Sequence, residues 1–586
     1  MLSYRKLAMR VLGRPLHTGG GGIDSPRPAS QRAAALVLTA AMLTTFTAPA
    51  FAKTWYIEDG DITISASETK GTNKVSQGAE PEVEDTGTII TNREKDASSH
   101  TVTINAGNDK VEVTLDNVNI KADSGSALIS KGDVTLTLKG DNHLTGGNGG
   151  SSSYGGDGIT SSGSLTISGG TVTATGGDST SSVGSGGSGI YSVSGDVTIS
   201  GGTVNANGGD GKNGSGGGSG IDSSGGVTVS GGTVTANGGD SKDGDGGSGG
   251  YGISSSGVAI SGGTVTANGG DGGSGSGSHG GNGIYSSGGV TISSGSTVTA
   301  NGGDGEDGSG GRGITSNGGV TVSGGTVNAK GGSGKNGNGG DGIRSFNPVA
   351  ISGGTVNANG GNSDYSNGGD GIRSLDHVAI SGGTVKSNGG SGNLSGGNGI
   401  ISYDIDLSGS LELTAKAGSP NGKALSRVGS ELDLNTIKDK LDPGAKVTAT
   451  DADGKVIQQV SIPRPVEPEE PSSSSDSGSA TPSAPASFLP GLTVTDKDGQ
   501  RISYTSTQSG NTLTVCVGRF TASLRISLAA LRQLRAEGIE TITFQTILCS
   551  TTLSVDELLA MGGEDAEVVL THHIRSSTLT VGGKAV

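Results

Sequence analysis

Short segments of alternating apolar and polar residues recur along the middle of the chain. One of them, S-G-G-T-V, ends at Val172, Val204, Val234, Val265, Val327, Val356 and Val385, and a divergent copy, S-S-G-S-T-V, ends at Val298. Successive copies lie 29 to 33 residues apart. A Gly-Ile pair opens each unit, so one unit reads G-I-x-S, a turn, V-T-I-S, a Gly-Gly corner, T-V-T-A and a glycine-rich loop.

This alternation predicts three short strands per unit, each with one buried face. In the unit that begins at Gly158, the inward positions are Ile159, Leu165, Ile167, Val172 and Ala174. No helical period interrupts the repeat. We therefore predict an all-β fold, a parallel β-helix in which each unit of about 29–33 residues forms one coil and equivalent strands pair about 4.8 Å apart.

The pattern divides the chain into six segments. We expect an N-terminal cap and first coils over 53–124, β-helix repeats over 125–418 and a C-terminal cap over 419–462, because a solenoid end must be protected from edge pairing. Residues 463–487 are rich in Pro, Ser and Glu and predict an extended linker.

Residues 488–586 have a different composition and predict a small α+β domain. A hairpin is expected around Asp498-Gly499 and a strand over T-L-T-V-C-V. Helices are expected from Ile526 to Gly538 and over S-V-D-E-L-L-A-M, followed by a strand over E-V-V-L-T-H.

The N-terminal segment, residues 1–52, has the pattern of a secretory signal peptide with a long basic leader. Arg27 and Arg32 precede the apolar run from Ala33 to Thr47, and A-P-A-F-A ends at Ala52. The apolar run is short for a membrane span, so no membrane insertion is expected once the signal is removed. We therefore expect a secreted protein, associated with the cell surface or released.

Composition and charge narrow the choice of partners. The chain has 586 residues, 116 of them glycine, and a net charge of −16. Nucleic acid requires clustered Lys and Arg and is not an expected partner. Two cysteines, Cys516 and Cys549, allow either a disulfide or two buried thiols.

The residue directly after each Gly-Ile pair forms a predicted outward column. The side chains in it with binding chemistry are Tyr191, Asp222, Tyr285, Arg344 and Arg373. Tyrosine rings stack on sugars, and guanidinium groups match the geometry of carboxylates. An ordinary solvated strand face is the alternative interpretation.

A second column of aspartates opens the glycine-rich loops. Its members are Asp178, Asp210, Asp240, Asp271 and Asp304. Carboxylates at one strand spacing repel unless cations bridge them, so these residues are candidate Ca²⁺ ligands. The alternative is that each Asp simply forms a turn. The asparagine before the same Gly pairs predicts a stacked amide ladder.

Residues ~100 to 415 resemble the clostridial β-helix carbohydrate-binding domain family of exported Firmicute proteins. The resemblance rests on V-E-V-T-L-D-N-V-N-I, on S-A-L-I-S-K-G-D-V-T-L-T-L-K-G-D-N-H-L-T-G-G and on the G-I-x-S units with S-G-G-T-V. It implies a right-handed parallel β-helix, Ca²⁺ sites and binding to plant cell-wall polysaccharides, especially acidic ones. The chain departs from the family in its long glycine loops and few aromatic residues.

Three functions follow from these patterns, in decreasing order of support. The first is a secreted, non-catalytic β-helix that binds polysaccharide with Ca²⁺. The second is a structural adhesin, in which the solenoid is a stalk and the C-terminal domain binds the cell envelope or a protein partner. The third is a polysaccharide-degrading enzyme, which we do not expect because no acid pair or catalytic set departs from the repeat.

Overall fold

The computed structural model describes residues 53–463 except 151–153, 182–183, 243–245 and 276. It also describes 492–585 except 497–499, 503, 510, 518–520, 547–549, 562–565, 573–576 and 583. The chain forms two compact units, divided between Glu467 and Pro468. The predicted signal peptide, residues 1–52, and most of the predicted linker lie outside the described residues.

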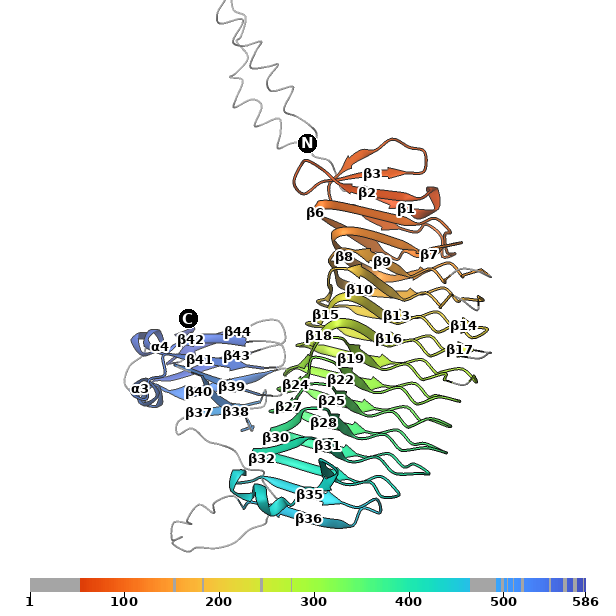
Figure 1. The fold of residues 1–586 in the computed structure, drawn as a ribbon. Coiled ribbons are helices and arrows are strands. Elements are labelled where there is room, and N and C mark those ends of the chain that lie inside the picture. Colours follow the sequence, from red (N-terminus) through yellow and green to blue (C-terminus); the bar gives the residue numbers. More distant parts are fainter. Residues whose placement is uncertain are drawn as a thin grey trace, which may run out of the picture. The chain divides into compact units, whose positions relative to one another are not determined.

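The first unit is a right-handed parallel β-solenoid of about 13 turns, as the repeat predicts (Figure 1). Three strands form each regular coil. The strands that follow the Gly-Ile pairs are β9 (Ile159–Ser162), β11 (Ile190–Ser194), β15 (Ile221–Val229), β18 (Ile253–Ile260), β20 (Ile284–Ser286), β23 (Ile314–Ser316), β26 (Ile343–Ser345), β29 (Ile372–Ser374) and β31 (Ile400–Ser402). In β15 and β18 this strand runs on without a break into the second one.

The other two strands of each coil flank the Gly-Gly corner. Those before it, some continuing past it, are β10 (Leu165–Thr175), β12 (Val197–Ile199), β21 (Val290–Ile292), β24 (Val320–Val322), β27 (Val349–Ile351), β30 (His377–Asn388) and β32 (Asp404–Lys416). Those after it are β13 (Thr203–Asn207), β16 (Thr233–Asn237), β19 (Gly263–Asn268), β22 (Ser296–Asn301), β25 (Thr326–Lys330) and β28 (Thr355–Asn359). Two short strands in the loops, β14 (Gly211–Lys212) and β17 (Ser241–Lys242), pair with each other.

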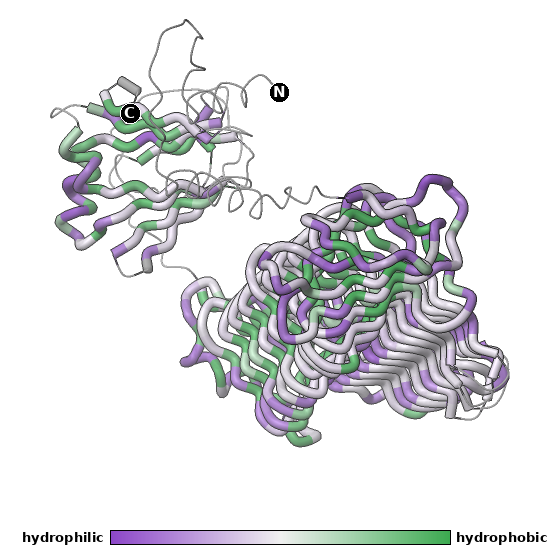
Figure 2. The backbone as a smooth tube through the Cα atoms, turned by 90° about the horizontal axis from the view of Figure 1, so that it is seen from above, coloured by the Kyte–Doolittle hydropathy of each residue, from purple (hydrophilic) through white to green (hydrophobic). Residues whose placement is uncertain are grey.

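Identical residues lie opposite each other in neighbouring coils. Val204 pairs with Val234 and Val234 with Val265, while Ile190 pairs with Ile221. All five inward positions predicted for the first regular coil, from Ile159 to Ala174, are fully buried. Figure 2 shows the hydrophobic positions as continuous lines along the stack. The core is therefore narrow and is built from one repeated set of small aliphatic side chains, which explains how a chain with 30% hydrophobic residues folds.

The Gly-Gly corner requires glycine for steric reasons. Gly202 adopts φ +79°, and a Cβ there would lie 1.5 Å from the carbonyl oxygen of Gly169 in the preceding coil. Both the left-handed backbone and the close approach exclude a side chain.

The glycine-rich loops are ordered layers rather than loose connections. Gly209 donates its N–H to the carbonyl of Gly187, Gly218 to that of Gly209, and Gly239 to that of Gly218, each at 2.8 Å. The same pattern continues to Gly418. The two legs of successive loops thus form one hydrogen-bonded ladder, and this close stacking of backbone on backbone accounts for much of the glycine content.

Antiparallel strands close both ends of the solenoid. At the N-terminus lie β1 (Thr54–Tyr56), a 3₁₀ turn η1 (Ile57–Asp59), β2 (Ile62–Ala66), β3 (Asn73–Gln77), β4 (Val83–Asp85), β5 (Ile89–Thr91), β6 (Val102–Asp116), β7 (Asn119–Lys121) and β8 (Leu128–Thr145). At the C-terminus lie β33 (Leu425–Arg427), β34 (Ser430–Glu431), the 3₁₀ helix η2 (Leu434–Lys440), β35 (Lys446–Thr450) and β36 (Val456–Ser461). The β2–β3, β3–β4 and β35–β36 pairs are antiparallel, so they end the parallel stacking.

The second unit has its own core, separate from that of the solenoid. Its elements are β37 (Leu492–Thr495), β38 (Thr505–Ser509), β39 (Thr512–Cys516), β40 (Ala522–Ser527), α3 (Leu528–Ala536), β41 (Thr541–Gln545), β42 (Ser550–Ser554), α4 (Val555–Met561), β43 (Glu567–His572), β44 (Ser577–Val581) and β45 (Lys584–Ala585). Figure 1 draws them in two sheets with the two helices.

One predicted boundary in this unit is wrong. The helix expected from Ile526 begins at Leu528, because Ile526 pairs in β40 and Ser527 caps the helix by accepting the N–H of Ala530. The predicted hairpin turn at Asp498-Gly499 lies outside the described residues, as does Cys549. Cys516 is a half-buried free thiol.

Candidate functional site

The predicted outward column is a real column of stacked side chains. We call the residues directly after the Gly-Ile pairs the outer column. Within it, Tyr191 pairs with Asp222, Tyr285 with Thr315, and Arg344 with Arg373 across neighbouring coils. The five predicted residues are all half-buried. Strand register therefore brings Tyr191 next to Asp222 and Arg344 next to Arg373, while Tyr285 lies two coils before Arg344.

Sequence reasoning missed a second column on the same face, which we call the preceding column. It consists of the residues directly before the Gly-Ile pairs, and its members with functional groups are Asp157, Tyr251, Asn282, Arg312, Asp341, Asp370 and Asn398. The repeat could have indicated this column, because the residue type at this position changes from unit to unit while the Gly-Ile pair that follows it is constant. The two columns together form the face.

Two tyrosines from the two columns stack on each other. The rings of Tyr251 and Tyr285 lie 5.4 Å apart between centroids with an interplanar angle of 17°. A cavity of about 280 Å³ beside them is lined by Tyr251, His279 and Arg312. Tyr251 of the stacked pair and Arg312 thus border one hollow of the face.

Below the tyrosine pair, charged residues of both columns alternate in an Arg–Asp ladder, which we define as Arg312, Asp341, Arg344, Asp370 and Arg373. Asp341 Oδ2 lies 3.5 Å from Arg312 Nε and 3.8 Å from an Arg344 nitrogen. Asp370 Oδ2 lies 3.3 Å from Arg373. The ladder has three positive and two negative side chains, so it is a positive strip on a chain whose net charge is −16.

The two ladder carboxylates are shielded from solvent. The side chains of Asp341 and Asp370 are 8% and 7% exposed. Asp341 Oδ1 accepts the N–H of Asp370, and Asp370 Oδ1 accepts the N–H of Asn398. Burial, followed by the charge of Asp341, raises the pKa of Asp370 to about 6.

The guanidinium groups of the ladder are incompletely satisfied. Among the described residues, the buried Nε atoms of Arg344 and Arg373 have no hydrogen-bond partner. Burial, followed by the charge of Arg312, lowers the pKa of Arg344, which shows that the cations crowd one another. An anion placed over the ladder would relieve that crowding.

The predicted acidic column is also in register, and its stacking has a structural explanation. Oδ1 of Asp178, Asp210, Asp240 and Asp271 each accepts the backbone N–H of the next aspartate at 2.7 to 3.0 Å, and Asp304 binds the N–H of Ser333 in the same way. Lys242 bridges Asp210 and Asp240. Each carboxylate therefore meets a backbone dipole of the following coil, which offsets repulsion along the column.

Binding of Ca²⁺ by these aspartates stays a prediction. A Ca²⁺ ion is bound by roughly six to eight oxygen atoms, which several side chains, backbone carbonyls or waters supply together. Oδ1 of each aspartate is already used by the neighbouring coil, and no group of three or more His, Cys, Asp or Glu within the described part of the chain is placed to hold a metal. Asp243 and Asp245, on the same loops, lie outside it.

The predicted amide ladder is confirmed. Asn237 donates to Asn207, Asn268 to Asn237 and Asn301 to Asn268 through their side chains at 2.8 to 2.9 Å. Lys330 interrupts it, and it resumes between Asn359 and Asn388. This ladder joins the corners of neighbouring coils and so has a structural role. The residue type in the outer column, by contrast, changes from coil to coil.

Comparison with known proteins supports the fold. A family model described as a beta helix repeat matches residues 165–189, 197–219, 258–282 and 349–372. No curated protein and no solved structure matches the chain. The match supports a beta-helix repeat family and leaves the resemblance to the clostridial carbohydrate-binding family as an expectation.

A search for membrane-spanning helices in the described residues found none of sufficient length and hydrophobicity.

Proposed function

We propose that the solenoid is a non-catalytic binding surface for an acidic polysaccharide, and that the chain is exported. The observation that carries the proposal is the Arg–Asp ladder beside the stacked Tyr251 and Tyr285 on one face. Arginine binds carboxylates through its planar fork of donors, and tyrosine rings pack on the apolar faces of sugars. The expected export rests on the N-terminal sequence pattern alone.

The geometry favours a ligand that runs along the solenoid axis. Five successive coils, from that of Ile253 to that of Ile372, contribute to the face between Tyr251 and Arg373, the last residue of the ladder. At about 4.8 Å per coil the path is roughly 20 Å long. A polymer with a regularly repeated carboxylate suits a surface whose cations repeat coil by coil.

A second candidate, cleavage of the polysaccharide, is favoured by one observation, the buried pair Asp341 and Asp370. Two coupled carboxyls, one with a raised pKa, are what glycoside hydrolysis requires. However, both side chains are buried and paired with arginines that are more exposed, and Oδ1 of each is held by a backbone N–H. A sugar on the surface meets guanidinium groups first, which supports binding over catalysis.

A binding panel tests the proposal. The purified chain is applied to a glycan array and to insoluble polygalacturonate and cellulose, with and without Ca²⁺. We expect retention on polygalacturonate that weakens with salt, because the attraction is between charges. Absence of binding to every polysaccharide contradicts the proposal. Release of reducing ends or unsaturated products from polygalacturonate would favour the enzyme instead.

A further inference from the structure

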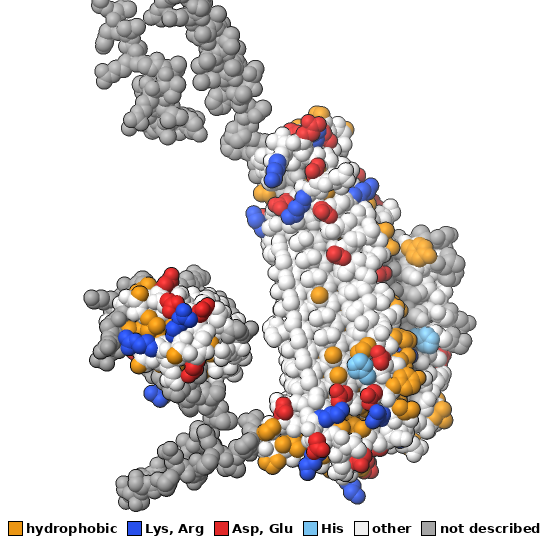
Figure 3. All heavy atoms as spheres, turned by 60° about the vertical axis from the view of Figure 1, so that its left-hand side comes forward, with side chains coloured by type: hydrophobic (Ala, Val, Ile, Leu, Met, Phe, Trp, Pro, Cys, Tyr) orange, Lys and Arg blue, Asp and Glu red, His pale blue; other side chains and the backbone are white. Residues whose placement is uncertain are grey.

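An apolar column borders the arginines in the last coils of the solenoid. It consists of the third residue after the inward aliphatic residue in four successive coils, Phe346, Leu375, Tyr403 and Val428, and we call it the turn column. The three preceding coils have Ser256, Ser287 and Asn317 at this position. An earlier coil has Val193 here, 47% exposed, but four successive apolar residues occur only in these last coils, where Figure 3 shows hydrophobic and charged side chains gathered together.

The turn column is exposed and its backbone is in register. Phe346, Tyr403 and Val428 are 45%, 65% and 69% exposed. The N–H groups of Phe346, Leu375 and Val428 each donate to the serine carbonyl of the preceding coil at 3.0 to 3.1 Å. Apolar side chains repeated on four ordered turns form a continuous stripe, which folding alone does not require.

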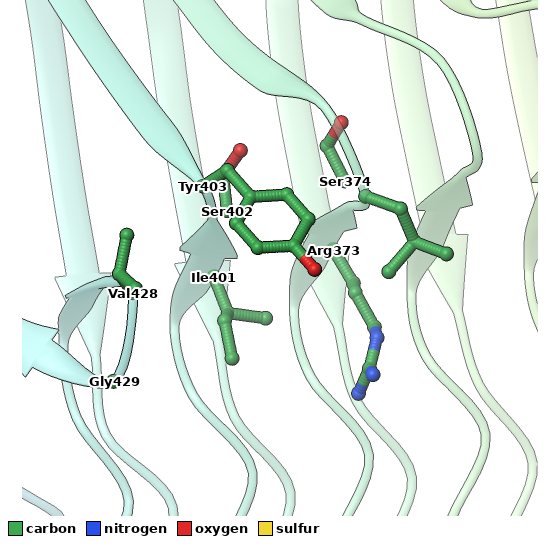
Figure 4. A pocket seen from close by; sticks show the side chains of 8 residues that line it. Arg373, Ser374, Ile401, Ser402, Tyr403, Val428 and Gly429 are labelled. Atoms are coloured by element: carbon green, nitrogen blue, oxygen red, sulfur yellow. The ribbon is translucent and has the colours of Figure 1, made fainter.

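Cations lie directly beside this stripe. The Arg344 guanidinium lies 5.3 Å from the centre of the Phe346 ring. A cavity of about 260 Å³ is lined by Arg373, Leu375, Ile401, Tyr403 and Val428. In Figure 4, Tyr403 and Ile401 lie beside Arg373, with Val428 on the next turn. The cavity therefore offers an apolar wall and a positive group to the same ligand.

The backbone at Val428 is set by a hairpin turn, because Arg427 pairs with Ser430 and leaves Val428 and Gly429 as the two central residues. Val428 adopts φ +48°, in the left-handed region that β-branched residues avoid. Its side chain is largely exposed, so burial in the core does not offset the strain. Gly429 follows at φ +78°, so both central residues are left-handed, as a type I′ turn requires, and the turn places Val428 at the wall of the cavity.

We propose that the turn column, together with Arg344 and Arg373, is a subsite for a chain of uronic acid residues, with the apolar sugar faces on Phe346 and Tyr403 and the carboxylates on the arginines. The subsite rests on the proposed function and gives it a location and a substrate class. Charge complementarity favours an acidic occupant. Arg344 and Arg373 lie beside the stripe, and the carboxylate of Asp404, next to Tyr403, is already paired with Arg427 at 3.0 Å. A ring with one apolar face and one carboxylate matches both halves of the stripe.

The test measures binding of oligogalacturonides and of the same oligomers after their carboxyl groups are reduced to alcohols. Arg373→Gln should lower affinity for the acidic oligomer by roughly tenfold or more, and change affinity for the reduced oligomer little. Tyr403→Ala should lower affinity for both, because the ring contacts the sugar rather than its charge. Melting curves verify that each variant is folded.

Leu394→Ala is the matched control, because Leu394 is 65% exposed on the glycine-rich loop instead of the turn column. It should bind as the parent does. Normal oligogalacturonide binding by Arg373→Gln and Tyr403→Ala, with loss in Tyr191→Ala or Tyr285→Ala, overturns the subsite and leaves the proposed function intact. Equal binding of polyglutamate, lost in the same variants, overturns the sugar as occupant. No binding of any glycan by the parent overturns the proposed function itself.

Discussion

Val428 is a β-branched residue at a hairpin turn that requires a left-handed backbone. Its φ of +48° suits Asn or Gly and disfavours a β-branched side chain. We expect Val428→Asn to stabilise the solenoid by about 1 kcal/mol, because the strain disappears and little buried contact is lost. Urea or thermal unfolding measures the change. A stability equal to or below that of the parent contradicts the strain argument.

Asp370 predicts an unusual pH dependence of stability. Burial and Asp341 raise its pKa to about 6 in the folded chain, while Asn398 and the charge of Arg373 lower it; Arg344 also faces it. The unfolded chain has an ordinary pKa of about 3.9. Between these values the folded state binds more protons than the unfolded state, so stability falls as pH rises from about 4 to about 6.

Replacing Asp370 by Asn should remove that decline, because the amide oxygen still accepts from Asn398 and cannot ionise. The melting temperature of Asp370→Asn minus that of the parent should therefore increase as the pH is raised from 4 to 7. The exposed Asp364→Asn variant is the control and should follow the parent curve. Parallel curves for Asp370→Asn and the parent would show that Asp370 does not titrate in this range.

At the scale of the elements, the glycine ladder fixes how the loops stack. A Cβ at Gly239 would lie 2.0 Å from the carbonyl oxygen of Gly209. Gly239→Ala should therefore destabilise the solenoid by more than about 3 kcal/mol, since two coils must separate to admit the methyl group. At Gly257 the nearest atom is 3.9 Å away, so Gly257→Ala should change stability by less than about 1 kcal/mol. Calorimetry of both variants measures the change in stability. If the loops were loosely packed instead of stacked in a ladder, the two substitutions would change stability equally.

The strands were predictable and the loops were not, for one physical reason. Alternation marks which side chains face the core, and Ile159 to Ala174 are buried as that pattern indicates. The loop layers depend on backbone-to-backbone contacts between glycines, which leave no hydrophobic period in the sequence. Stacking of Arg344 on Arg373 followed from the repeat. Their pairing with Asp341 and Asp370 did not, because it joins two columns whose separation depends on the backbone path at each Gly-Ile pair.

The contacts of the acidic column were also not predictable from the sequence pattern. Charge repulsion along the column predicts bridging cations, which stay a prediction, and it gives no hint of the backbone N–H that the structure places against each carboxylate. The preceding column uses the same device, since Asp157 accepts the N–H of Ser188 and Asn398 that of Lys423. An acidic or amide side chain at either end of a loop thus ties one coil to the next, and this contact is by itself a structural reason for such residues to recur.

At the scale of the whole molecule, two separate cores predict two independent unfolding events. The solenoid core ends at Val460 and the core of the second unit begins at Leu492, with no buried residue shared between them. Calorimetry of the full chain should show two transitions, and a fragment of residues 53–462 should retain one of them at an unchanged temperature. The same fragment should bind oligogalacturonides as the full chain does, because the whole face lies within it. Loss of binding in a folded fragment would show that binding of the sugar depends on the second unit. That result would favour the adhesin, in which residues 488–586 make the attachment.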